Sequence, residues 1–171
     1  MVAMLRGVNV SGKNKLPMSE FRSVLGELGF ANVATYIQSG NAVVDTDRSS
    51  AQVAETVRAA LADRFGIDTP VIVRTADELE TVLTADPFAE RDLDPSKVIV
   101  SFLAEPALEA LSIPEGRPEE AHAFGREVWV YYPMGIGKSK LDRTPFWKPL
   151  GNAAVTARNL RTVRKLSDMA R

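Results

Sequence analysis

The residues best suited to chemistry lie in a glycine-rich loop near the start of the chain. Gly7, Gly12 and Lys13 have the spacing of a phosphate-binding loop, in which a glycine stands five positions before a Gly-Lys pair. That pattern ends in a serine or threonine whose hydroxyl contacts Mg²⁺, and Asn14 occupies this position instead. We therefore expect a loop that presents backbone N–H groups and positive charge to an anion, but not a nucleoside triphosphatase.

Two groups of polar residues make up this candidate site. The loop carries cationic and amide side chains, and a short turn around Gly40 adds further polar groups. A glycine turn with solvated lysines would have the same composition, and an Asn beside a Gly is typical of turns alone. The spacing leaves open whether the loop and the turn lie side by side. The candidate ligand-binding residues of the two groups are Arg6, Asn9, Lys13, Asn14, Lys15, Gln38, Ser39 and Asn41.

A third candidate region is the basic end of the chain. Residues 1–133 carry 12 Lys or Arg and 20 Asp or Glu, whereas residues 134–171 carry 9 and 2. A basic segment with interleaved aromatic residues can hold phosphates and stack on bases. It can equally pack across the acidic part of the chain, or form the exposed face of a last helix. Its candidate ligand-binding residues are Lys138, Lys140, Arg158 and Asn159.

Familiar catalytic and metal-binding sets are missing from the sequence. There is no cysteine, and the sole histidine, His122, falls in an expected strand, far in sequence from any plausible nucleophile. This excludes disulfides, cysteine nucleophiles and thiolate zinc sites, and we expect neither a metal site nor a cofactor. No two carboxylates have the spacing of an acid–base pair, so we assign no catalytic residue.

The composition limits the kind of protein. The 171 residues are 45% hydrophobic and 25% charged, which is typical of a globular chain with one domain or two small ones. No apolar run approaches the roughly 18 residues that a membrane-spanning helix needs, and the apolar N-terminus is interrupted at Arg6. We expect a soluble, cytoplasmic protein without a membrane partner, and leave its oligomeric state open.

Hydrophobic periodicity predicts the elements that position these residues. In residues 1–74 we expect a strand at 1–5, a helix at 17–28, strands at 33–38 and 42–46, a helix at 50–65 and a strand at 70–74. This order is that of a split βαβ, or ferredoxin-like, unit. The hairpin around Gly40 argues against a doubly wound parallel sheet, in which strands and helices would alternate strictly.

The second half of the chain has a similar outline. Residues 75–96 are predicted to form a connecting helix and a polar linker. In residues 97–171 we expect a strand at 97–103, a short helix at 106–111, a hairpin of 121–124 with 127–132 and a C-terminal helix, but no evident fourth strand. The predicted fold class is α+β, with duplicated ferredoxin-like units, mixed or antiparallel sheets and helices on one face.

Several segments also resemble one bacterial family. They are LRGVNV at 5–10, GKNK at 12–15 and YIQSGN at 36–41, then KL at 140–141, TARN at 156–159 and VRKL at 163–166. The chain thereby resembles domain of unknown function 1697 over essentially its whole length, although Leu160 stands where such families usually have an aromatic residue. The resemblance implies a bacterial α+β protein of duplicated ferredoxin-like character, without an assigned activity. Its motifs fall mainly on polar loop residues, which packing alone explains poorly.

Three functions are compatible with these features. The leading hypothesis is a binder of a phosphate-bearing ligand, a nucleotide or nucleic acid, through loop 6–15 and the basic segment 138–165; a pI of about 5.9 counts against a dedicated nucleic-acid binder. The second is a small phosphate-ester or acyl-phosphate hydrolase, in which Arg6 holds the phosphoryl group and Asn41 orients water, by analogy of fold alone. The third is an assembly or regulatory domain that binds protein partners through its hairpin edges.

Overall fold

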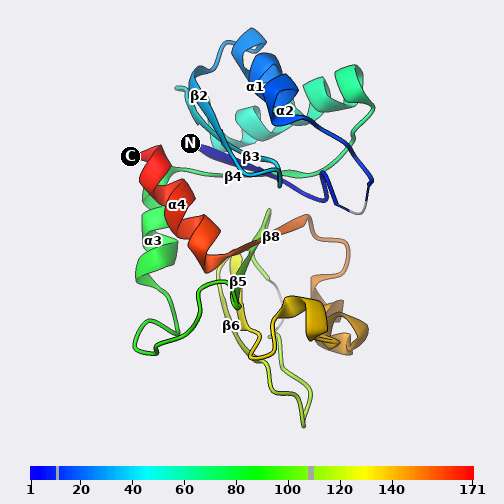
Figure 1. Cartoon of the computed structure of the whole chain (residues 1–171), viewed down its shortest axis with the longest axis vertical. Coiled ribbons are helices and arrows are strands. Elements are labelled where there is room, and N and C mark those ends of the chain that lie inside the picture. Colours follow the sequence, from blue (N-terminus) through cyan, green and yellow to red (C-terminus); the bar gives the residue numbers. More distant parts are fainter. Residues whose placement is uncertain (11, 108–109) are drawn as a thin grey trace. The chain divides into compact units, whose positions relative to one another are not determined.

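The computed structural model describes residues 1–10, 12–107 and 110–171, so that Ser11, Leu108 and Glu109 lie outside the described residues. The chain divides into two compact units. Unit 1 comprises Met1–Thr81 and Lys165–Arg171, and unit 2 comprises Val82–Arg164. Each unit contains a four-stranded sheet in which every pair of neighbouring strands is antiparallel (Figure 1). The predicted α+β class is thus confirmed.

Unit 1 follows the predicted order of strands and helices. Its sheet has the strand order β2-β3-β1-β4, which places the first strand in the interior of the sheet. The elements are β1 (Val2–Leu5), α1 (Met18–Glu27), β2 (Ala31–Tyr36), β3 (Asn41–Asp45), α2 (Ser50–Phe65) and β4 (Val71–Arg74), followed by α3 (Ala76–Thr84), which continues into unit 2.

The core of unit 1 lies between its sheet and the helices α1 and α2. Ala3 and Leu5 alternate along β1, and therefore place their side chains on the same face of the sheet. They pack with Phe21 of α1 and Leu61 of α2, all fully buried. The helix α2 begins with a capping box between Ser49 and Gln52, as its sequence favours. This packing fixes the start of α1, where the candidate site lies.

Unit 2 contains the second sheet, with the strand order β6-β7-β5-β8. Phe146, from the basic region, is buried in its core beside Leu141. The strands are β5 (Val98–Leu103), β6 (Glu120–Phe124), β7 (Glu127–Tyr131) and β8 (Val155–Asn159). Three 3₁₀-helices, at Ile136–Lys138, Leu141–Arg143 and Pro145–Leu150, connect β7 to β8, and α4 (Leu160–Ala170) begins in unit 2 and ends in unit 1.

The structure corrects two predictions for the second half. A fourth strand, β8, is present where the sequence analysis expected none, because the residues that it buries, Thr156 and Arg158, are polar, whereas strand prediction expects the buried residues to be apolar. The expected helix at 106–111 is absent from its described residues, which have no regular structure, while Leu108 and Glu109 lie outside them. A run of six residues is too short to nucleate a helix without strong tertiary packing.

Helix length and composition also bear on the expected absence of a membrane partner. Among the described residues, no helix combines the length and the apolar character that crossing a membrane would require.

Candidate functional site

In the glycine-rich loop (residues 6–16, of which Ser11 lies outside the described residues), Asn9 and Asn14 form hydrogen bonds that connect the two sides of the loop. The N–H of Asn9 donates to the carbonyl of Asn14 at 3.1 Å, and Asn14 Nδ2 donates to the carbonyl of Gly7 at 3.2 Å. Asn9 and Asn14 have positive φ angles of 55° and 47°, and Gly7 and Gly12 have φ angles of 62° and 76°. Gly and Asn are the residues that adopt this conformation most easily, which explains their spacing in the loop.

Asn9 joins the glycine-rich loop to the turn at residues 37–40. Its Nδ2 donates to the carbonyls of Leu16 and Gln38, each at 2.8 Å, and its Oδ1 accepts from the N–H of Leu16 at 2.8 Å. A further backbone bond of 2.8 Å runs from Leu5 N to Gly40 O. The loop and the turn therefore lie side by side, a point that the sequence left open.

The turn itself contains a strained residue. Ile37 has a φ of 51°, which is rare for a β-branched side chain and costs about 1–2 kcal/mol. Ile37 is 50% exposed, so only part of its surface is buried to offset this strain. Strained residues that packing does not explain are concentrated at functional sites. The left-handed geometry also explains why β2 ends at Tyr36, two residues before the predicted end of the strand.

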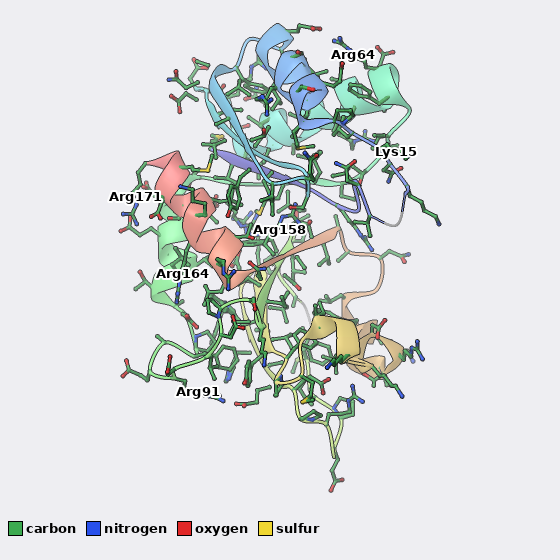
Figure 2. All side chains as sticks on the ribbon, in the orientation of Figure 1. Lys15, Arg64, Arg91, Arg158, Arg164 and Arg171 are labelled. Carbon is green, nitrogen blue, oxygen red and sulfur yellow. The ribbon has the colours of Figure 1, made fainter. Side chains whose placement is uncertain are left out.

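An open hollow lies where the loop, the turn and the start of α1 meet. It has a volume of about 570 Å³, within the roughly 300–1,000 Å³ that is usual for small-molecule sites. We call it the loop hollow; Lys15, on the adjoining loop, is labelled in Figure 2. The polar residues that line it are Asn9, Lys15, Ser19, Arg22 and Gln38.

The loop hollow carries positive charge. Lys15 and Arg22 are both exposed, and Arg22 Nη1 donates to the hydroxyl of Thr35, which orients the guanidinium. The helix α1 starts at the hollow, and Pro17 gives its first turn no side-chain cap. The N–H groups of that turn add partial positive charge. Glu20 is the acidic residue of the first turn and does not line the hollow.

Three of the predicted ligand-binding residues meet in the loop hollow, namely Asn9, Lys15 and Gln38. Two residues that the sequence analysis missed, Ser19 and Arg22, complete it. Their positions in the first turns of a predicted amphipathic helix are typical of solvated residues, so composition offered no signal. Only the position of α1 beside the loop identifies them.

The other predicted residues of unit 1 lie outside this lining. Arg6 and Lys13 are exposed, and Asn14 closes the loop as described above. Asn41 is fully buried, and its Nδ2 donates to the carbonyl of Tyr36 and to the hydroxyl of Ser39. Asn41 and Ser39 thus shape the turn from within.

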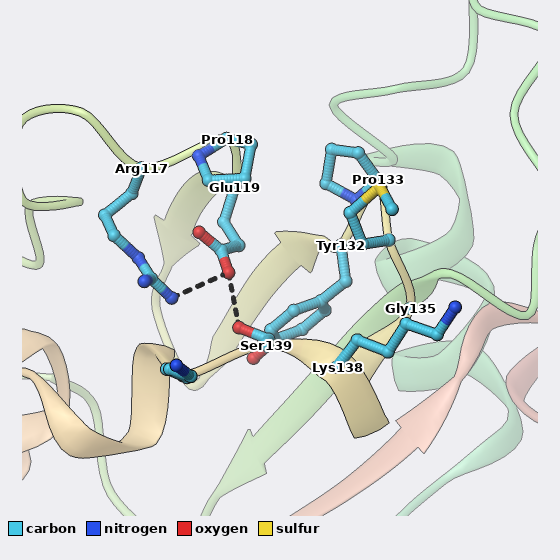
Figure 3. A pocket seen from close by; sticks show the side chains of 10 residues that line it. Arg117, Pro118, Glu119, Tyr132, Pro133, Gly135, Lys138 and Ser139 are labelled. Atoms are coloured by element: carbon cyan, nitrogen blue, oxygen red, sulfur yellow. Dashed lines mark hydrogen bonds and ion pairs between the residues drawn. The ribbon is translucent and has the colours of Figure 1, made fainter.

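Lys138 and Lys140 line a second, smaller hollow, which lies in unit 2 and has a volume of about 120 Å³. We call it the Glu119 pocket. Figure 3 shows Arg117, Glu119 and Ser139 converging there. Glu119 Oε1 accepts from Arg117 Nη2 at 3.0 Å and from the hydroxyl of Ser139. The side chain of Glu119 is only 3% exposed.

Burial, hydrogen bonds and neighbouring charges shift the pKa values of two groups in the Glu119 pocket. For Glu119, burial raises the pKa, but hydrogen bonds from Ser139 and from its own backbone, together with Arg117, outweigh it and hold the pKa below its usual value. For Tyr132, burial and the nearby negative charges of Glu119 and Asp142 raise the pKa to about 12. Among the described residues, no group of three or more His, Asp or Glu side chains is placed to hold a metal ion.

The raised pKa of Tyr132 gives a testable pH dependence. The pKa rises from 10.0 to about 12 on folding, so between these values the unfolded chain loses the phenol proton first, and the free energy of unfolding falls as the pH rises. We expect the Tyr132→Phe protein to lack this component of the fall. A pH titration followed by phenolate absorbance should also lose its latest phase in this variant. Identical titrations of the two proteins would contradict the assignment.

Arg158 and Asn159 lie at the end of β8 and have clear structural contacts. Arg158 is 8% exposed and donates to the hydroxyl of Thr156 and to the carbonyl of Ala157, each at 2.8 Å. Burial lowers the pKa of its guanidinium to about 10. Asn159 Oδ1 accepts from the N–H of Thr162 at 2.9 Å and so caps the start of α4. The alternative that the basic residues form the exposed face of the last helix therefore does not hold for Arg158, which lies in β8.

Comparison with known proteins gives a description of the chain without an activity. A family model described as "Protein of unknown function (DUF1697)" matches residues 1–129, which include the glycine-rich loop and the turn. No curated protein matches the chain. The structure is similar to that of the conserved bacterial protein SP0830 from Streptococcus pneumoniae, with 26% sequence identity and a TM-score of 0.77. That similarity covers 99% of this chain and 97% of the other.

Proposed function

The chain belongs to the family of proteins of unknown function DUF1697, as its motifs predict, and because membership brings no ligand, we propose one from the geometry. The loop hollow binds a phosphate-bearing ligand, either a nucleotide or nucleic acid. One observation carries this proposal: Lys15, Arg22 and the uncapped first turn of α1 converge on one open hollow of about 570 Å³.

The chemistry of the loop hollow suits a phosphate more than a neutral ligand. Two cations and the N–H groups of a helix start all favour negative charge, and phosphate oxygens accept such hydrogen bonds well. The amides of Asn9 and Gln38 lie beside these cations. Asn9 Nδ2 is already bonded to two carbonyls, whereas Gln38 is exposed and its side-chain amide can accept from and donate to a sugar or base.

Removing either cation of the loop hollow should weaken binding about tenfold, because a hydrogen bond between charged groups is worth roughly 1.5–3 kcal/mol before solvent screening. We would screen the full-length protein by thermal shift against nucleotides, inorganic and acyl phosphates, and short single-stranded RNA and DNA. A ligand at a hundred times its Kd should add about 2.7 kcal/mol to the stability. The hits would then be titrated against Lys15→Ala and Arg22→Ala.

A matched control for these variants lies in the same loop. Lys13 is also an exposed lysine of the glycine-rich loop, but it does not line the hollow. Lys13→Ala should therefore change the affinity much less than Lys15→Ala. For a nucleic-acid ligand, Lys15→Ala should also reduce the slope of log affinity against log salt concentration, by about the amount that one phosphate contact contributes. Equal losses in the two lysine variants would contradict the proposed position of the ligand, and a panel without any hit would overturn phosphate binding.

The alternative of a phosphate-ester or acyl-phosphate hydrolase has weaker support. It needs the side chain of Asn41 to orient a water, yet Asn41 is fully buried and its Nδ2 is bonded to Tyr36 and Ser39. The third alternative, an assembly or regulatory domain, is favoured by no specific contact in the described residues. We therefore place binding before both.

We also propose that both units are ferredoxin-like, as the sequence predicts. In unit 1 this is supported by the order of its elements and by the strand order β2-β3-β1-β4. In unit 2 the strand order is β6-β7-β5-β8. If the strands of each unit are counted along the chain, both sheets have the order second, third, first, fourth. The connections of unit 2 differ, because 3₁₀-helices stand where unit 1 has α2. A cytoplasmic location also stays part of the proposal, supported by a composition without cysteine.

A further inference from the structure

The connection between β7 and β8 carries positive charge that the loop hollow does not include. Residues 138–148, which we call the basic connection, hold four exposed cations and one acidic residue, Asp142. None of the four makes an ion pair among the described residues, whereas Arg91 and Arg161, also exposed and in unit 2, are paired with carboxylates. The cations are Lys138, Lys140, Arg143 and Lys148.

The fold brings three of these cations together. Lys138 and Lys140 line the same hollow. The N–H of Arg143 donates to the carbonyl of Lys140 at 3.0 Å, which closes one 3₁₀ turn. Side chains three residues apart in such a turn stand on the same side, so Arg143 lies beside Lys140. Leu141, between them, is fully buried and anchors the turn in the core of unit 2.

An aromatic side chain belongs to the same segment. Trp147 is half-buried and packs against the core of unit 2, with its ring centroid 4.6 Å from that of Phe146. Its 3₁₀-helix, Pro145–Leu150, packs against the 3₁₀-helix that contains Arg143 (Figure 1). The core therefore holds the indole of Trp147 in one orientation and leaves part of it exposed. The other tryptophan of the chain, Trp129, is only 1% exposed.

A single-stranded nucleic acid suits this combination better than a small anion. The hollow beside Lys138 and Lys140 has a volume of about 120 Å³, which corresponds to about four waters at roughly 30 Å³ each. A nucleotide does not fit into this space, whereas an extended polyanion can contact the cations along the surface. A rigid, partly exposed aromatic ring among cations can also stack on a base. Only the unpaired bases of a single strand are free to stack in this way.

We propose that the basic connection binds single-stranded RNA or DNA without a sequence requirement. Its phosphates contact Lys138, Lys140 and Arg143. One base stacks on Trp147, and Lys148 adds positive charge beside it. This goes beyond the proposed function, because it uses other residues in the other unit, and each of the two can fail without the other.

The test is a titration of the full-length protein with a labelled single-stranded oligothymidylate of about ten nucleotides. Tryptophan fluorescence detects stacking, and anisotropy of the label measures the affinity. Because Trp129 is buried, a base can stack only on Trp147. We expect saturable quenching in the wild-type protein and none in Trp147→Phe. Trp147→Ala should weaken binding about tenfold.

Two charge variants test the phosphate contacts. Lys140→Gln and Arg143→Gln, both at exposed positions, should each reduce the slope of log affinity against log salt concentration by about 0.7. Arg161→Gln is the matched control. It removes an exposed arginine of unit 2 that is paired with Asp94 at 3.6 Å, and it should leave the slope unchanged.

Two further probes separate stacking from charge. Inorganic polyphosphate has no bases, and a DNA duplex has its bases stacked on one another. Neither should quench Trp147, and polyphosphate should bind about tenfold more weakly than the single strand. If Trp147→Phe fails to fold, these probes and the two charge variants still decide the outcome.

Three results would overturn the proposal. They are the absence of saturable quenching, quenching that persists in Trp147→Phe, and polyphosphate that binds as tightly as the oligothymidylate. Lys15→Ala should give wild-type quenching, because the loop hollow is a separate site. If the oligothymidylate binds in the loop hollow instead, Lys15→Ala loses affinity and no protein shows quenching of Trp147. That outcome would overturn this proposal and support the proposed function.

Discussion

Gly40→Ala should be among the most destabilising single substitutions in unit 1, with a loss of about 3 kcal/mol or more. A Cβ atom at this position would lie 2.5 Å from Val8 Cγ2 and 2.8 Å from Leu5 Cβ. Leu5 and Val8 are buried, and Leu5 Cβ cannot move without its backbone in β1. The φ of Gly40 is 73°, which adds a cost for any side chain. Both the space and the backbone conformation therefore require glycine.

The control for this prediction is Gly12→Ala. Gly12 has nearly the same φ, 76°, but a Cβ there would meet no atom within 4 Å. Gly12→Ala should therefore lose only about 1–2 kcal/mol of stability, which is the cost of a side chain in this backbone conformation. Chemical denaturation of both variants measures the difference, which reports the close packing of the turn against the loop. Equal losses would show that the turn can move away from Leu5 and Val8.

Asn9→Ala should cost about 2–3 kcal/mol of stability, because it removes three side-chain hydrogen bonds with a net value of roughly 0.5–1.5 kcal/mol each. These bonds connect Asn9 to Leu16 and Gln38, and so attach the glycine-rich loop to the turn. The same variant should weaken the binding of any ligand to the loop hollow, because Asn9 would no longer hold the loop with Lys15 beside the turn with Gln38. Denaturation and thermal-shift titration measure the two effects on one protein.

Asn14→Ala is the matched control for Asn9→Ala. Both residues are asparagines of the same loop in the left-handed conformation, with φ angles of 47° and 55°, so alanine costs a similar amount of backbone energy at each. Asn14, however, makes one side-chain hydrogen bond, to the carbonyl of Gly7 at 3.2 Å. Asn14→Ala should therefore lose less stability than Asn9→Ala, by about 1 kcal/mol or more. A loss at Asn14 equal to that at Asn9 would contradict the role assigned to the loop–turn bonds.

Asn9→Asp separates the hydrogen bonds of Asn9 from one another. Aspartate keeps the acceptor for the N–H of Leu16, but it loses both donors and brings a charge next to the carbonyls of Leu16 and Gln38. It should therefore be no more stable than Asn9→Ala at neutral pH. Recovery of wild-type stability by Asn9→Asp would mean that only the bond to Leu16 N contributes.

The elements of the first half could be predicted from sequence because their signals are local. Phe21 and Leu25 recur at helical spacing, and Ser49 with Gln52 marks the start of α2. Such patterns depend on neighbours within a few residues, and the structure confirms them. In the second half, β8 was missed because its strand character depends on burial of Arg158 among distant residues, which no local pattern encodes.

For the candidate site, too, one part could be predicted from the sequence and another part could not. The sequence by itself predicted a loop rich in glycine and asparagine after the first strand. The structure then shows Gly7, Asn9, Gly12 and Asn14 in the left-handed conformation, which these two residue types tolerate best. The sequence also marked Lys15 and Gln38 as polar loop residues. The tertiary structure alone decided that loop and turn share one hollow, that Ser19 and Arg22 belong to it, and that Asn41 and Arg158 are buried. Contacts between residues far apart in the chain decide these points, since they depend on how strands pair and how a helix packs on the sheet.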